Sequence, residues 1–127
     1  MLANNLNEIL EKFDFTDSIV TCVKWSDNMI DLIVLVDYYW DIQEGRDNTR
    51  VLKLIFKNCI KANFQISKEL PLNNDVINTD SCFTIVLLKE KEASNLAKNM
   101  EKQVEIFTTD YSMPWLSVVC GEVLLTE

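Results

Sequence analysis

The sequence feature that most constrains the fold is an unbroken run of strand-forming residues over 29–41. The run is rich in β-branched and aromatic residues and has turn-forming residues on both sides. Successive side chains of a strand point to opposite faces of the sheet, so the run divides into two alternating sets. One set is apolar and is expected to face a core: Ile30, Leu32, Val34, Val36, Tyr38 and Trp40. The run predicts a long, half-buried strand around which the other elements pack.

The opposite face of this strand begins apolar and becomes acidic and aromatic, and a polar loop follows it. Aromatic side chains anchor protein interfaces because they bury a large area for few lost rotamers, and charge speeds the encounter with a partner of opposite charge. We therefore predict a partner-binding site made of Asp37, Tyr39, Asp41, Glu44 and Asp47. The alternative is that Tyr38 and Trp40 are core residues and that the acids only keep an edge strand soluble.

The same alternation predicts further strands, over 18–25, 50–57, 59–66, 81–88, 104–111 and 115–125. The turn signal at 26–28 predicts that the first of these strands forms an antiparallel hairpin with the central one. Two strands have clear inward sets, namely Leu52, Leu54 and Phe56 in one, and Ile60, Ala62, Phe64 and Ile66 in the other. Trp25 and Trp115 are in register with apolar neighbours and are assigned to the core.

Helical spacing appears at two places. Apolar residues over 2–13 recur at the spacing of an amphipathic helix: Leu2, Leu6, Ile9, Leu10 and Phe13. Residues 89–103 have a helix-forming composition, although a β-hairpin with a charged turn is the competing assignment. Residues 70–79 form the most obvious loop. The prediction is an α+β protein dominated by an antiparallel sheet of six or seven strands, curled into a sandwich or a partly open barrel.

Length and charge limit the function classes. With 127 residues the chain is expected to form one domain, 1–127. Twenty acidic and twelve basic residues give a net formal charge of −8, which disfavours binding to nucleic acid. A basic partner is favoured, although solubility alone would also explain this charge. The N-terminus has no signal-peptide pattern and no apolar run is long enough to span a membrane, so a cytoplasmic protein is expected.

The residues available for catalysis are few. The chain contains no histidine, which removes the commonest general base and most catalytic metal sites. Its two glycines, Gly45 and Gly121, cannot build a phosphate-binding loop. The four cysteines are far apart and form no metal-ligand pair. A carboxylate pair such as Asp37 and Asp41 is the only remaining catalytic arrangement. No enzyme activity, cofactor or metal is therefore expected.

Three stretches resemble a known family. These are the paired strands over 17–25 and 30–40, the segment 54–59 with its Phe-x-Asn-Cys pattern, and the closing Trp-Leu-Ser-Val-Val at 115–119. They are similar to the mostly-β group of bacterial immunity proteins called immunity protein 50, which are encoded beside polymorphic toxins. The resemblance implies a single-domain cytoplasmic protein that binds and blocks a toxin domain, and it implies no catalytic residues.

The functional hypothesis is therefore a non-catalytic protein-binding module that occludes a basic toxin domain through its acidic surface, as a monomer or a homodimer. One alternative is a small β-barrel that holds an apolar small ligand in its interior. The other is a homo-oligomeric structural protein assembled through an exposed strand edge.

Overall fold

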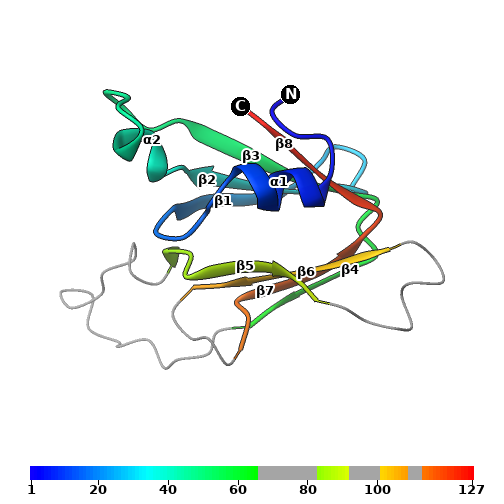
Figure 1. The fold of residues 1–127 in the computed structure, drawn as a ribbon. Coiled ribbons are helices and arrows are strands. Elements are labelled where there is room, and N and C mark those ends of the chain that lie inside the picture. The colour runs from blue at the N-terminus through cyan, green and yellow to red at the C-terminus, as the bar shows by residue number, and fades with distance from the viewer. Residues whose placement is uncertain (66–82, 92–100, 109–112) are drawn as a thin grey trace.

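Two four-stranded antiparallel sheets are stacked face to face in the computed structural model, which describes residues 1–65, 83–91, 101–108 and 113–127 (Figure 1). The order of the first sheet is β1 (Ile19–Trp25), β2 (Leu32–Asp37), β3 (Val51–Lys57) and β8 (Glu122–Thr126). The order of the second is β4 (Lys61–Phe64), β7 (Leu116–Cys120), β6 (Lys102–Phe107) and β5 (Leu87–Glu90). Over the described strands, the sheets are not closed into a barrel. The α+β antiparallel prediction is confirmed, and of its two forms the sandwich is the one observed. The described chain has eight strands, however, where the sequence predicts six or seven.

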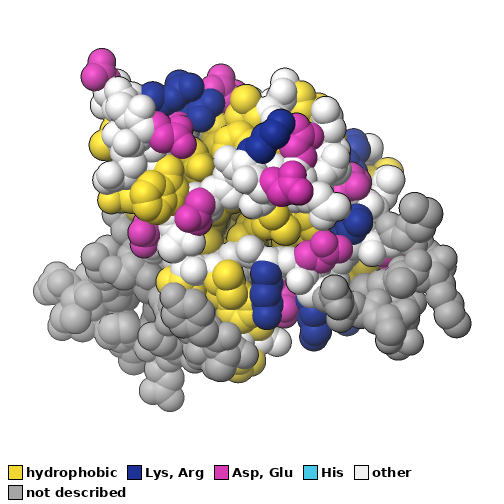
Figure 2. Space-filling view, viewed as in Figure 1, with side chains coloured by type: hydrophobic (Ala, Val, Ile, Leu, Met, Phe, Trp, Pro, Cys, Tyr) yellow, Lys and Arg dark blue, Asp and Glu magenta, His cyan; other side chains and the backbone are white. Residues whose placement is uncertain are grey.

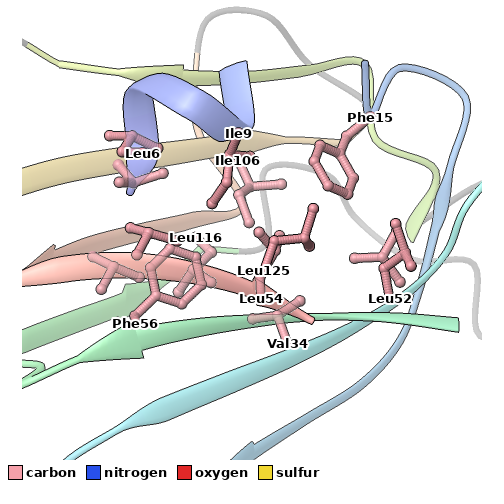
Figure 3. Close-up of a cluster of buried hydrophobic side chains, with 14 of the residues drawn as sticks. Leu6, Ile9, Phe15, Val34, Leu52, Leu54, Phe56, Ile106, Leu116 and Leu125 are labelled. Atoms are coloured by element: carbon pink, nitrogen blue, oxygen red, sulfur yellow. The ribbon is translucent and has the colours of Figure 1, made fainter. Parts of the chain in front are cut away.

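The core lies between the two sheets (Figure 3). The predicted inward faces of β2 and β3 are confirmed, since each of these side chains is at most 2% exposed: Leu32, Val34, Val36, Tyr38, Leu52, Leu54 and Phe56. From the second sheet, Ile106 and Leu116 pack against them. Strands alternate strictly between two faces, so one buried face per strand is enough to fill this layer.

Helix α1 (Leu6–Lys12) covers one side of the sandwich and is shorter than the predicted helix over 2–13. Asn5 caps its N-terminus, accepting a hydrogen bond from the Glu8 N–H at 2.8 Å, and Leu6 and Ile9 are buried. Leu2 precedes the helix because its N–H donates to the carbonyl oxygen of Leu125 in β8. In the described chain, neither this helix nor the second one has the length and apolar content needed to cross a membrane.

The predicted hairpin of β1 and β2 is confirmed, with antiparallel pairing from Ile19 opposite Asp37 to Trp25 opposite Leu32. Trp25, however, is 41% exposed and Ile30 is 46% exposed, so their assignment to the core is wrong. Both lie where the sandwich ends, and β1 is an edge strand. Trp115 is partly buried and packs against the core cluster, with its ring centroid 5.6 Å from that of Phe64.

The chain changes sheets at two adjacent points. The predicted strand over 115–125 is wrong, because it is two strands in different sheets that separate at Gly121. The Gly121 N–H donates to the Lys57 carbonyl at 2.8 Å, beside the other crossing. There Asn58 has a φ of 52°, a left-handed conformation that asparagine tolerates. This crossing also displaces the predicted inward set of 59–66. Among its described members, Ile60 and Phe64 are exposed and only Ala62 packs against the core.

The two ends of the segment 89–103 belong to paired strands rather than to a helix, as the competing hairpin assignment predicts. Lys89 pairs with Glu105 and Glu90 with Val104, so the chain leaves β5 and returns antiparallel in β6. The middle of this segment, residues 92–100, lies outside the described residues, as do the predicted loop over 70–79 and Ile66. The predicted strand over 81–88 is displaced as well, because β5 begins only at Leu87.

The cysteines differ in their access to solvent, which predicts different reactivities. Cys120 is fully buried, and burial raises its thiol pKa to about 12, while Cys22 is exposed. Because the thiolate is the reactive form, we expect iodoacetamide to alkylate Cys120 at least about a hundredfold more slowly than Cys22 in the native protein. Peptide mass spectrometry of each site would measure this, with labelling in urea as the control. Equal native rates would contradict the buried position of Cys120.

Candidate functional site

The strand predicted over 29–41 ends at Asp37, and a short helix α2 (Trp40–Gln43) follows it. The Tyr38 N–H still continues the pairing with β3, donating to the carbonyl oxygen of Arg50 at 2.9 Å. The chain then leaves the sheet, and the Tyr39 N–H donates to Ser18 Oγ at 3.0 Å. The strand prediction is therefore wrong for the last residues of this run, because the contact with Ser18 comes from a part of the chain that local periodicity does not include.

Asp41 is fully buried, so the prediction that it is exposed for partner binding is wrong. Its carboxylate accepts a hydrogen bond from the Arg50 N–H at 2.7 Å and two from the guanidinium, Nε to Oδ2 at 3.0 Å and Nη2 to Oδ1 at 2.8 Å. These bonds from Arg50 hold the pKa of Asp41 below its ordinary value. Arg50 also pairs with Glu127 at 3.1 Å. The Asp41 carboxylate therefore closes the loop that runs from α2 to β3.

Tyr38 and Trp40 fix the connection between α1 and β1 against the end of β2. The Tyr38 hydroxyl accepts a hydrogen bond from the Asp14 N–H at 3.2 Å, and its ring lies 5.5 Å from the ring of Phe15. Trp40 Nε1 donates to the carbonyl oxygen of Thr16 at 3.0 Å. Tyr38 is 2% exposed and Trp40 packs partly buried against the core cluster. Of the two alternatives considered from the sequence, the core assignment fits both aromatic residues.

These contacts bring together acidic residues from two segments, which we call the acidic end: Asp14, Asp17, Asp37, Glu44 and Asp47. Tyr39 and Ile42 are exposed among them, at 38% and 45%. Figure 2 shows acidic side chains beside hydrophobic ones around α2 and the connection from α1 to β1. Residues 1–47 contain ten acidic and three basic residues, so they hold a net formal charge of −7 out of the total of −8.

Four of the five predicted binding residues belong to this surface. Tyr39, Glu44 and Asp47 are exposed, and Asp37 is partly buried. The sequence-based prediction missed Asp14 and Asp17, although the acids of the 13–17 segment were a visible signal. Burial raises the pKa of the Tyr38 hydroxyl, and the charges of Glu44 and Asp14 raise it further. Glu44 and Asp14, one from each segment, therefore both lie near this hydroxyl.

The carboxylates of the acidic end are largely uncompensated. Among the described residues, no lysine or arginine lies within ion-pairing distance of Asp14, Asp17, Glu44 or Asp47. Oδ1 of Asp37 is enclosed and has no hydrogen-bond donor in the described structure.

A recess of about 370 Å³ adjoins the acidic end. It is lined, within the described chain, by residues 10–16 from the end of α1 and its connection to β1, and by Leu87 and Leu88 of β5. A smaller recess of about 210 Å³ lies on another side of the sandwich, between residues 20–23 of β1 and the rings of Phe83 and Trp115.

The chemistry available at the acidic end is recognition of positive charge. Asp41 is held by Arg50, so Asp37 and Asp41 do not form a free carboxylate pair. In the part of the chain that the structure describes, no three potential metal ligands are grouped together. Exposed carboxylates around an exposed tyrosine are suited to a basic protein surface. No family model and no curated protein matches this sequence.

Proposed function

We propose that this protein is a non-catalytic binding module that occludes a basic toxin domain, in the manner of a bacterial immunity protein. The observation that carries the proposal is the acidic end itself, where two segments place uncompensated carboxylates around the exposed Tyr39 and Ile42. The resemblance of the strands and of the segment 54–59 to the immunity protein 50 group also implies a toxin domain as the partner. The protein would act in the cytoplasm by forming a stoichiometric complex.

The rigidity of the surface supports this proposal. The Asp41 carboxylate binds both the backbone and the side chain of Arg50, and Trp40 and Tyr39 each hydrogen bond to the segment 16–18. A surface that is already ordered loses little conformational entropy when a partner binds, so more of the interaction energy contributes to affinity. The carboxylates would take the place of the phosphate groups to which a basic nuclease domain binds, and would block its substrate groove.

The alternative of an interior apolar ligand has less support. Such a ligand requires a closed sheet with an internal cavity, whereas the described strands form two separate sheets and side chains of both pack together between them. Both recesses described above are lined by residues at the margins of the sandwich.

Reversing two charges of the acidic end is expected to slow association with the partner about tenfold. The variant is Glu44→Lys with Asp47→Lys, both of which are exposed and outside all ion pairs of the described structure. Loss of electrostatic steering lowers the association rate more than it raises the dissociation rate. The partner is first captured from native cell extract at low salt and identified by mass spectrometry, and the rates are then measured by surface plasmon resonance.

The control is Asp27→Lys with Glu101→Lys, which changes the total charge equally at the opposite end of the sandwich. We expect it to alter the association rate less than about twofold. Equal effects of the two double variants would contradict the acidic end as the binding surface. Co-expression tests the immunity role directly, because the wild-type protein should restore growth of cells that produce the captured partner. Failure to restore growth would leave a binding module without this role.

A further inference from the structure

The larger recess has the form of a binding site for one long side chain. Its lining is mixed, and its exposed surface is more polar than apolar. The apolar side chains come from the end of α1, the connection to β1 and β5, and the polar ones are Glu11, Lys12, Asp14 and Thr16. Phe15 is buried and packs into the core, whereas Leu10 is 37% exposed at the mouth. A volume of about 370 Å³ is at the small end of the range for ligand pockets, so it suits a side chain better than a large cofactor.

Two carboxylates lie in the lining of this recess without a cation. Neither Glu11 nor Asp14 takes part in an ion pair of the described structure. Lys12, which also lines the recess, has its ammonium group 2.8 Å from Glu8 Oε1 on the preceding turn. One oxygen of Asp14 accepts the Thr16 N–H at 2.9 Å, which fixes the position of this carboxylate. Glu11 stands in the last turn of α1, where the helix dipole disfavours a negative charge, so its placement does not serve the stability of the helix.

We propose that this recess binds an arginine side chain of the basic partner. The guanidinium would bind the carboxylates of Glu11 and Asp14, and the aliphatic stem would pack on the apolar side chains of the mixed lining. The inference deepens the proposed function and rests on it for the protein that supplies the arginine. The recess shares Asp14 with the acidic end, so a partner covering that surface would reach it.

A small probe tests the recess without the partner. Acetyl-arginine methylamide is titrated into the ¹⁵N-labelled protein, and the two-dimensional amide spectrum is followed. We expect saturable shifts at residues 10–16, 87 and 88, with a dissociation constant on the order of 1–10 mM. The citrulline analogue has the same shape without the charge and should bind at least about tenfold more weakly, because it does not form the charge-assisted hydrogen bonds.

Two variants separate the recess from total charge. Glu11→Gln with Asp14→Asn should weaken probe binding at least about tenfold, and the asparagine can still accept the Thr16 N–H. Asp27→Asn with Glu101→Gln removes equal charge at the opposite end and should leave binding unchanged. Shifts confined to residues outside the recess, equal binding of the citrulline analogue, or unchanged binding to the Glu11→Gln, Asp14→Asn variant would each overturn the inference. The proposed function would survive that result if association of the captured partner still depended on Glu44 and Asp47. If the probe binds but no basic partner is captured from the extract, the proposed function alone is contradicted.

Discussion

Replacing Asp41 with asparagine is expected to lower the free energy of unfolding by about 3 kcal/mol, because it removes one member of an ion pair that is largely enclosed. The Asp41 side chain is fully buried and that of Arg50 is 19% exposed. Without the carboxylate, the guanidinium stays in its position with little water to solvate it. Urea unfolding followed by circular dichroism at about pH 7 would measure the change.

The pH dependence gives a second readout of the same pair. The pKa of Asp41 is lower in the folded protein than its ordinary value of 3.8, so its contribution is present above that value and is lost as the pH falls through the folded pKa. The difference between the wild type and Asp41→Asn should therefore shrink in acid. The Glu127 side chain, the outer partner of Arg50, is 59% exposed. Glu127→Gln should therefore lower the free energy of unfolding by less than about 1 kcal/mol. A pH-independent difference would contradict an ionised Asp41.

Replacing Tyr38 with alanine is expected to cost about 3–4 kcal/mol, because it leaves a cavity where a buried ring joins two segments. The ring is 2% exposed and contacts Phe13 and Phe15 at centroid distances of 5.8 and 5.5 Å. Its loss should also loosen the 13–17 segment, which holds Asp14. Urea unfolding would measure the stability, and hydrogen exchange of the amides over 13–18 would report the local loosening.

Tyr38→Phe separates the hydroxyl from the ring. It keeps the aromatic contacts and removes only the acceptor of the Asp14 N–H, so we expect a loss of about 1 kcal/mol. An alanine variant as stable as the phenylalanine variant would mean that the ring contributes little to joining the two segments.

Local patterns in the sequence were sufficient to predict much of the fold. The period-two alternation correctly placed every second residue from Leu32 to Tyr38 and from Leu52 to Phe56 on the core side. A strand with one buried face requires an apolar residue at every second position. The turn residues at 26–28 correctly gave the antiparallel hairpin, because they allow the chain to reverse within a few residues. The same signals predicted that an acidic surface follows the central strand.

Only the tertiary structure decided where strands end and which acids face solvent. The alternation is a local property, so it continued past Asp37 and through Gly121, although contacts with distant segments turn the chain at both places. Trp25 follows the apolar pattern but lies on an edge strand where the sandwich ends. Asp41 and Asp47 are equally acidic in the sequence. Arg50 encloses the first and leaves the second exposed, because burial of a charge depends on a partner that folding brings close.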